Sequence, residues 1–160
     1  MALVMTASGV FTVLSALRAA GATAWVDGGW GVDALLGRTT REHSDLDLVV
    51  LMPELDVVRA ALADIGFGTV LRDWLPAALA LADLMGSEVD LHPVTPDGLG
   101  GGHQELPDGD RFYYPRPVAG QIDGVVVDCV DAATQVLAHQ GYTPSAKDLA
   151  DLRLLKSLVD

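Results

Sequence analysis

The sequence contains little cysteine, few basic residues and no long hydrophobic run. Its single cysteine, Cys129, excludes an internal disulfide and a zinc site built from cysteines. Lys and Arg number 10 against 22 Asp and Glu, and the resulting net charge of −12 argues against broad electrostatic binding to duplex DNA or anionic membranes. No apolar stretch approaches the ~18 residues that a membrane span requires. The acidic balance suits a cationic small molecule, or simply keeps the protein soluble.

Half of the 160 residues are hydrophobic, which predicts a folded chain with a core of its own. We expect one domain over residues 1–160. The first positive charge is Arg18, so the N-terminal segment predicts an amphipathic helix rather than a signal peptide. With one cysteine, read as a small buried hydrophobe in "VVVDCV", a reducing cytoplasm is the expected location.

Apolar periodicity predicts helices that alternate with strands early in the chain. Thr6 or Ser8 caps a first helix that stops at Gly21, a glycine pair opens a short helix, and Pro53 starts a third. "TAWV" and "DLDLVVLM" predict strands. "AALALADLM" and "SEVDLHPV" predict a hairpin that turns near residues 86–87, although the first of these segments could also form a helix.

Strands cluster in the second half. Residues 95–120 are rich in Gly, Pro and Asp, which indicates a turn between short strands, and "VVVDCV" predicts another strand. Asp131 caps a helix through His139 that Gly141 ends, and Ser145 with Asp148 forms a possible capping box for the last helix. The fold class predicted is α+β (mixed α/β), with helices packed on one sheet.

Two carboxylates stand at the start of the strand "DLDLVVLM". Side chains alternate along a strand, so Asp45 and Asp47 share one face while Leu46 and Leu48 occupy the other. Two close carboxylates repel unless a positive charge lies between them, and magnesium favours such oxygen ligands. Taken alone, D-x-D is a short and common pattern, and both residues could be solvated at the end of a strand.

Three neighbours favour a functional site. The glycines at Gly28 and Gly29 allow phosphate to approach the backbone, and the helix behind them offers free N–H groups. Asp90 is a lone carboxylate on an apolar strand, which is costly unless it is a third ligand or lies at a surface edge. Arg41 and His43 flank the pair and could meet phosphate, or could lie in an exposed turn.

The segment "WVDGGWGVDALLGRTTREHSDLDLVV" resembles the antibiotic-inactivating nucleotidyltransferases of the DNA polymerase β-like superfamily. That superfamily has a Gly-Gly or Gly-Ser turn, then D-x-D on the next strand, then a third carboxylate. Gly28, Gly29, Asp45, Asp47 and Asp90 match this pattern in order. The likeness extends to "VDLHPV" and "HQGYTPSAKDLADLRLL". It is strongest to small lincosamide nucleotidyltransferases, followed by aminoglycoside 2″-nucleotidyltransferases.

The resemblance implies a nucleotidyltransferase fold and transfer of a nucleoside monophosphate to a drug hydroxyl, with resistance as the result. Asp45 and Asp47 would hold magnesium on a nucleoside triphosphate, and Asp90 would help them to hold a second ion. Asp90 could instead be the general base, with His92 a weaker candidate and more simply a structural histidine. A homodimer is expected by analogy.

The resemblance suggests further contacts from the end of the chain. Lys147 could reach the triphosphate or be a solvated surface residue, and Tyr142 could stack on the base or on the drug. Arg41 and His43 complete the expected set of nucleotide-binding residues, with no nucleic acid or membrane as partner.

Other classes fit the residues less well. A haloacid dehalogenase-type hydrolase also uses D-x-D, but Leu48 and the valines after it replace the small or hydroxylated residue expected there. Ser44 and His43 are adjacent and cannot form a Ser-His-Asp relay. The stronger alternative is a non-catalytic or repurposed member of the same fold, such as an antitoxin-like partner or a biosynthetic protein.

Overall fold

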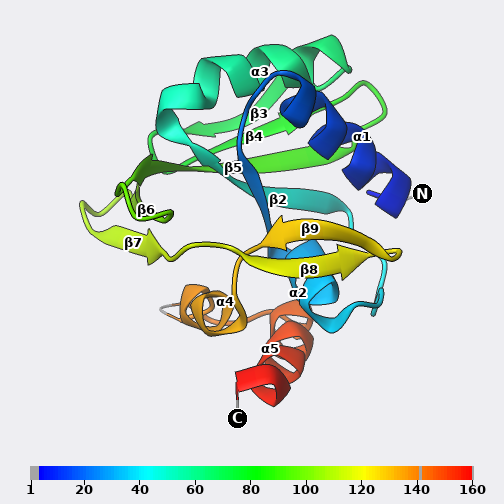
Figure 1. Cartoon of the computed structure of the whole chain (residues 1–160), viewed down its shortest axis with the longest axis vertical. Coiled ribbons are helices and arrows are strands. Elements are labelled where there is room, and N and C mark those ends of the chain that lie inside the picture. The colour runs from blue at the N-terminus through cyan, green and yellow to red at the C-terminus, as the bar shows by residue number, and fades with distance from the viewer. Residues whose placement is uncertain (1–3, 141, 160) are drawn as a thin grey trace.

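A mixed β-sheet forms the centre of the protein. Helices α1 and α3 lie toward one end of the molecule, at the top of Figure 1, and α2, α4 and α5 lie toward the other. The computed structural model describes residues 4–140 and 142–159. Its helices are α1 (Ala7–Ala19), α2 (Gly28–Leu36), α3 (Leu55–Asp64), α4 (Ala132–Ala138) and α5 (Ala146–Val159), with a 3₁₀ turn at Met52–Glu54. Its strands are β1 (Ala24–Asp27), β2 (Asp45–Leu51), β3 (Thr69–Trp74), β4 (Ala78–Ala82), β5 (Glu88–Pro96), β6 (Gly102–Glu105), β7 (Arg111–Tyr114), β8 (Val118–Ile122) and β9 (Val125–Cys129).

The strands follow the order β3-β4-β5-β2-β1-β9-β8, and a second hairpin, β6-β7, extends from the end of β5. β2 pairs with β5 in parallel and with β1 in antiparallel orientation, so the sheet is mixed. The first residues of β2 and β5 therefore lie beside the last residue of β1, at one edge of the sheet formed by these strand ends. Polar side chains at this edge come from segments up to 63 residues apart in sequence, since Asp27 and Asp90 both lie there.

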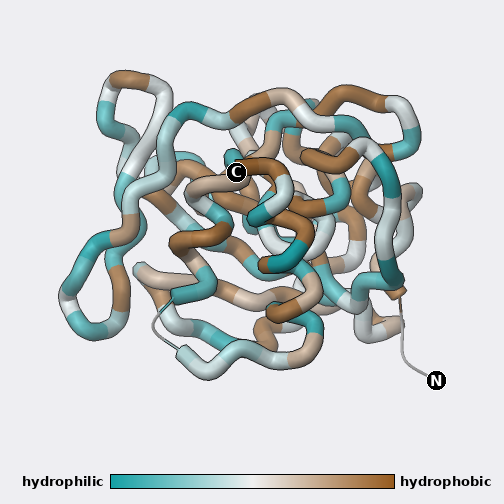
Figure 2. The backbone as a smooth tube through the Cα atoms, turned by 90° about the horizontal axis from the view of Figure 1, so that it is seen from below, coloured by the Kyte–Doolittle hydropathy of each residue, from teal (hydrophilic) through white to brown (hydrophobic). Residues whose placement is uncertain are grey.

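One face of the sheet is buried by α1 and α3. The apolar residues at alternate positions of β2, Leu46, Leu48 and Val50, join a core that includes Val13 of α1 and Val58 of α3. Hydrophobic and hydrophilic residues alternate over short stretches along the chain tube in Figure 2, as this packing requires. The opposite face of β2 is free to carry the carboxylates.

The local predictions from sequence are largely confirmed. Thr6, rather than Ser8, caps α1, because its Oγ1 accepts from the backbone N–H of Gly9 at 3.1 Å. The hairpin predicted near residues 86–87 joins β4 to β5. Ser145 and Asp148 make the capping box of α5, with hydrogen bonds of 2.9 and 3.2 Å.

Two helix boundaries differ from the prediction. Pro53 lies in a 3₁₀ turn, and the α-helix starts afterwards, at Leu55. α4 ends at Ala138, with His139 as its C-cap, and the stop predicted at Gly141 lies outside the described residues. Among the helices that the structure describes, none combines the length and apolar character needed to cross a membrane.

Candidate active site

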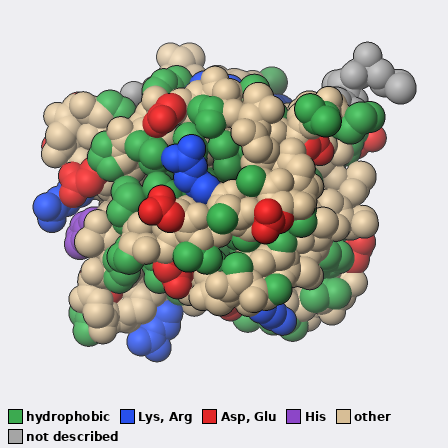
Figure 3. Space-filling view, turned by 90° about the horizontal axis from the view of Figure 1, so that it is seen from above, with side chains coloured by type: hydrophobic (Ala, Val, Ile, Leu, Met, Phe, Trp, Pro, Cys, Tyr) green, Lys and Arg blue, Asp and Glu red, His purple; other side chains and the backbone are tan. Residues whose placement is uncertain are grey.

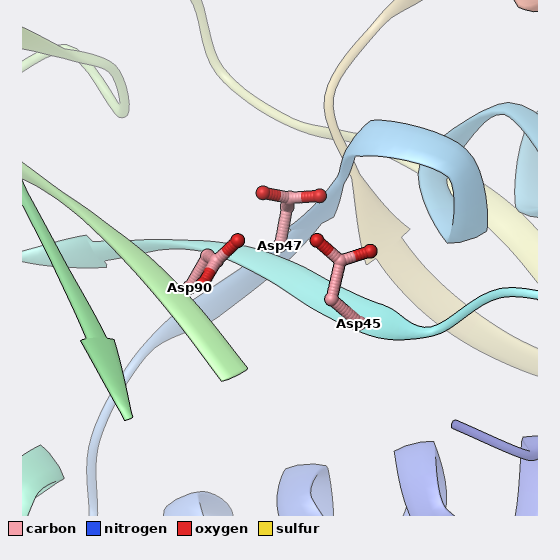
Figure 4. A group of neighbouring side chains, drawn as sticks. All are labelled: Asp45, Asp47 and Asp90. Atoms are coloured by element: carbon pink, nitrogen blue, oxygen red, sulfur yellow. The ribbon is translucent and has the colours of Figure 1, made fainter. Parts of the chain in front are cut away.

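Three aspartates meet where β2 and β5 begin. Asp47 pairs with Asp90 across the parallel strands, and Asp45 lies two residues earlier on the same face of β2. One carboxylate oxygen from each residue lies within 4.8 Å of the other two. Figure 4 shows the three side chains pointing toward a common space. The predicted convergence of these acids is therefore present.

The electrostatics of the cluster suit a cation. Burial, the contact with Glu88 and the charges of Asp47, Glu88 and Asp45 raise the pKa of Asp90 to about 9. Burial and the charge of Asp47 also raise the pKa of Asp45. Burial is the largest cause of both shifts, and the mutual repulsion of the carboxylates adds to it, even though Arg72 lies 2.6 Å from Glu88 and 3.5 Å from Asp90. Since all three donors are hard carboxylate oxygens, the cluster fits magnesium or a similar divalent ion.

A fourth carboxylate, Asp27, completes a row across the sheet. It ends β1 directly opposite Asp47 and is 7% exposed. Burial raises its pKa, and the charge of Asp47 adds to this effect. Asp27 holds the N-cap position of α2, but its side chain makes no capping hydrogen bond to the residues described.

The glycine turn packs directly against these acids. Gly28 has a φ of 62°, and a Cβ added there would overlap the carboxylate of Asp47. A Cβ on Gly29 would come within 2.5 Å of His43 Nδ1 and 2.7 Å of Arg41 Nη2. Both positions therefore require glycine, one for conformation and space and the other for space. The first N–H groups of α2 begin here, beside the acids, and can receive an anion.

A cleft of about 470 Å³ lies over Asp27, Asp45, Asp47 and the glycine turn, and Asp90 lies behind its lining residues. The β6-β7 hairpin forms one wall and the α4–α5 junction the other. The cleft is lined by Asp27, Gly28, Gly29, Arg41, Asp45, Asp47, His92, Gln104, Leu106, Phe112, Tyr114, Leu137, Ala138, His139, Gln140, Tyr142, Lys147, Asp148 and Asp151.

The family model for aminoglycoside-2″-adenylyltransferase matches residues 9–155. The chain belongs to this family. A lincosamide resistance protein of Staphylococcus haemolyticus is 29% identical over 151 residues, which cover 93% of each protein. The crystal structure of the lincosamide antibiotic adenylyltransferase LnuA with lincomycin superposes with a TM-score of 0.85 and 29% identity, over 98% of this chain and 99% of that one.

A second solved relative, ANT(2″)-Ia in complex with adenylyl-2″-tobramycin, has a TM-score of 0.73 over 96% of this chain and 88% of that one. Its identity of 21% supports the fold alone. Together these findings confirm the predicted resemblance to the antibiotic nucleotidyltransferases and the mixed α+β nucleotidyltransferase fold. Membership of the adenylyltransferase family makes the chain a nucleotidyltransferase, and the alternative of a non-catalytic or repurposed protein of the same fold is not favoured.

The structure brings most of the other predicted residues to the cleft. Arg41 lines it and forms an ion pair with Asp151 of α5, with 3.0 Å between Nη2 and Oδ2. Tyr142, before α5, and Lys147, near its start, also line the cleft. Arg41, Tyr142 and Lys147 therefore lie on the wall formed with the α4–α5 junction.

His43 is the exception, because its side chain is buried and does not line the cleft. Its Nε2 lies 2.6 Å from Asp33 Oδ2, and both side chains are only 2% exposed. Its ring packs on Trp30 at a centroid distance of 4.7 Å. The prediction that His43 meets phosphate is therefore wrong in this structure. The buried ring packs against Gly29 of the glycine turn instead.

His92 lies within the cleft but is tied to the acidic cluster, with 3.1 Å between its Nε2 and Asp47 Oδ1. Burial opposes a charge on the ring, but the hydrogen bond to Asp47 and the neighbouring carboxylates raise the pKa of His92. Sequence reasoning missed Gln104, whose Nε2 approaches His92 Nδ1 from β6 at 3.4 Å. The segment that contains Gln104 showed no periodicity from which a position at the cleft could be predicted.

Proposed function

We propose that the protein transfers a nucleoside monophosphate from a magnesium-bound nucleoside triphosphate to a hydroxyl of a small antibiotic, and so confers resistance. A lincosamide is the first candidate acceptor and an aminoglycoside the second. The observation that carries the proposal is the meeting of three aspartate carboxylates, within 4.8 Å of one another, two of which line a cleft beside a glycine turn.

Asp45 and Asp47 would hold magnesium together with the triphosphate, and all three acids would share a second ion. When bound, magnesium would lower the pKa of the acceptor hydroxyl and offset charge on the phosphate oxygens. The all-oxygen donor set and the mutual repulsion of the three carboxylates support this assignment.

The triphosphate would lie against the N-terminus of α2. The N–H groups that follow Gly28 point out of the helix, and the glycine turn lets phosphate oxygens come close to the backbone. The side chains of Arg41 and Lys147 add positive charge on the same wall. Burial of the phosphates among these groups would exclude water from the α-phosphorus.

The acceptor would enter along the β6-β7 wall, where Leu106 and Phe112 provide apolar surface. Its hydroxyl oxygen would attack the α-phosphorus, its proton would pass to Asp90, and pyrophosphate would leave. We assign Asp90 as proton acceptor because a bound divalent cation would offset the carboxylate charges that help to raise its pKa, whereas His92 is already engaged with Asp47. The apolar wall and the full-length match to a lincosamide resistance protein support a lincosamide over a polycationic acceptor.

The test is the release of pyrophosphate by the purified protein, measured with each common nucleoside triphosphate across a panel of lincosamides and aminoglycosides. We expect release that depends on a lincosamide, and a loss of at least about 100-fold in Asp47→Asn. If no acceptor stimulates release, or Asp47→Asn is as active as the parent, the proposal is wrong. Calorimetric binding of magnesium nucleotide without turnover would indicate the non-catalytic alternative.

We further propose that two chains associate as a homodimer and that the protein acts in the cytoplasm. Large apolar side chains exposed on and near β3 support a contact between protein surfaces: Val70, Leu71, Trp74, Leu84 and Met85. Sedimentation equilibrium would give twice the chain mass if two copies associate, and the chain mass if they do not.

A further inference from the structure

We infer that Gln104, a buried residue of β6, is a positioning residue for Asp47 and acts on it through His92. The inference rests on the proposed role of Asp47 as a metal ligand. It concerns a part of the chain, the β6-β7 hairpin, to which neither the motifs nor the comparisons assign a role. A chain of hydrogen bonds runs from the hairpin through His92 to the acidic cluster.

The orientation of the Gln104 amide is fixed by a neighbour that can only accept. Gln104 is 7% exposed, and its Nε2 donates to the carbonyl oxygen of Ala77 at 2.7 Å. The carbonyl has no hydrogen to give, so the amide nitrogen must face it. On the other side, Oε1 accepts from the hydroxyl of Tyr114 at 3.5 Å.

This orientation selects one tautomer of His92. The second hydrogen of Gln104 Nε2 points toward His92 Nδ1, 3.4 Å away. A ring nitrogen that faces a donor must be the acceptor, so the proton of the neutral ring lies on Nε2. Nε2 then donates to Asp47 Oδ1 at 3.1 Å.

Asp47 is thereby held from two sides. His92 engages Oδ1, while Oδ2 lies against Gly28, where a Cβ would overlap it. The carboxylate has one orientation, with its remaining lone pairs directed away from His92 and available to a cation. Partners that orient ligating groups in this way typically change metal affinity by about 10–100-fold when they are removed.

The same contacts keep His92 from acting as the general base. Its one lone pair in the neutral form faces Gln104, and its N–H faces Asp47. A second proton, on Nδ1, would point at an amide N–H.

The first test measures binding of Mn²⁺ by electron paramagnetic resonance, in the presence of a non-hydrolysable nucleoside triphosphate. We expect Gln104→Leu to weaken Mn²⁺ binding by about 10–100-fold. The matched control is Gln121→Leu, an exposed glutamine on strand β8, which should bind as the parent does. Mn²⁺ binding by Gln104→Leu within about twofold of the parent would overturn the inference.

A double-mutant cycle separates positioning from a general packing effect. His92→Gln retains an amide N–H that can reach Asp47 without help from Gln104, so adding Gln104→Leu to it should cost little further Mn²⁺ affinity. If the two losses simply add, Gln104 does not act through His92. Retained turnover in His92→Gln would also show that the ring is not the base, whereas a loss of turnover with unchanged Mn²⁺ affinity would contradict our assignment.

A measurement on the unaltered protein remains decisive if Gln104→Leu does not fold. The ¹⁵N chemical shifts of His92, recorded with Mg²⁺ and the non-hydrolysable triphosphate, report which ring nitrogen carries the proton. We expect the Nε2–H tautomer, and an Nδ1–H ring would overturn the inference. Neither the ¹⁵N chemical shifts nor the Mn²⁺ measurement requires an acceptor. The inference about Gln104 can therefore fail while the proposed transfer is correct, and the proposed transfer can fail while the inference is correct.

Discussion

Position 28 requires glycine because the carboxylate of Asp47 fills the space that a Cβ would need. The same residue has a positive φ, so two separate constraints act on it. Gly37, at the other end of α2, has a φ of 72°, and no heavy atom among the described residues lies within 4 Å of a Cβ built there. The two glycines thus separate the effect of conformation from the effect of contact with the site.

We expect Gly37→Ala to lower the free energy of unfolding by about 1–2 kcal/mol, the cost of a left-handed residue, with little change in turnover. Gly28→Ala should carry a similar cost and also displace Asp47, so turnover should fall by at least about 100-fold. Thermal unfolding together with pyrophosphate release distinguishes the two variants. Equal activities would contradict the contact between Gly28 and Asp47.

How far the site can be predicted depends on the kind of residue. Asp45, Asp47 and Asp90 could be found because a charge on an apolar strand is costly without a partner. His43 was misassigned because nothing in its local sequence reveals that Asp33, on the preceding helix, turns back to bind it. Gln104 could not be found at all, since its partners lie on other strands and its own segment is a Gly- and Pro-rich region.

At the scale of elements, the loop between α2 and β2 is fixed by Asp33. Its carboxylate accepts from the backbone N–H of Thr40 at 3.1 Å and from the Thr40 hydroxyl, and contacts His43. Burial acts against the charge, but these hydrogen bonds outweigh it and hold the pKa of Asp33 below its usual 3.8. The loop is thereby stabilised by the ionised form of Asp33.

The sign of the pH dependence follows from this lowered pKa. The stabilisation is complete above pH 3.8, the unfolded value, and is lost as the pH falls through the lower folded value. Asp33→Asn should lower the free energy of unfolding by about 1–3 kcal/mol near neutral pH, and the difference from the parent should shrink below pH 3.8. Urea titrations at several pH values measure it. A difference that grows on acidification would contradict the assignment.

The last helix reaches the site through a buried carboxylate. Asp151 of α5 is 7% exposed at its side chain and pairs with Arg41, whereas Glu105 and Arg111 form a surface pair with side chains 40% and 65% exposed. Loss of Asp151 leaves a partly buried guanidinium without its partner. The position of α5 over the cleft depends on this contact.

We therefore expect Asp151→Asn to lower the free energy of unfolding by about 1–3 kcal/mol, and Glu105→Gln by no more than about 0.5 kcal/mol. Chemical denaturation of both variants gives the comparison. Similar small losses in the two variants would mean that the Arg41 pair contributes no more than an exposed one.

Helix ends and hairpins were predictable because their signals are local. The cap at Thr6 and the capping box at Ser145 each involve residues three positions apart. The parallel pairing of β2 with β5 joins residues more than 40 positions apart, and no local pattern specifies its register. The site depends on that register, because a shift by one residue would turn Asp90 to the opposite face.

At the scale of the whole molecule, acidic residues outnumber basic ones, and the basic side chains do not form a patch that could bind a polyanion on the face shown in Figure 3. The face in Figure 3 shows Lys and Arg side chains as separate spots among acidic and hydrophobic ones. The cationic groups that matter, Arg41 and Lys147, lie instead inside the cleft. A net charge of −12 thus coexists with two cationic side chains at the cleft where we propose that the triphosphate binds.

Because ions and nucleotide bind only the folded chain, they should stabilise it together. At a ligand concentration about 100 times its dissociation constant, the gain is about 2.7 kcal/mol. We expect the melting temperature to rise with magnesium and triphosphate added together, to rise less with either alone, and to return to its starting value with EDTA. An equal rise in Asp47→Asn would place the binding elsewhere.

We propose that the three carboxylates beside the glycine turn catalyse the transfer of a nucleoside monophosphate to a drug hydroxyl. The most direct test is the mass of a lincosamide after incubation with the protein, magnesium and a nucleoside triphosphate. The account predicts a gain of one nucleoside monophosphate on a hydroxyl of the lincosamide, absent with EDTA and in Asp47→Asn. An unmodified drug, or modification that persists in Asp47→Asn, would contradict it.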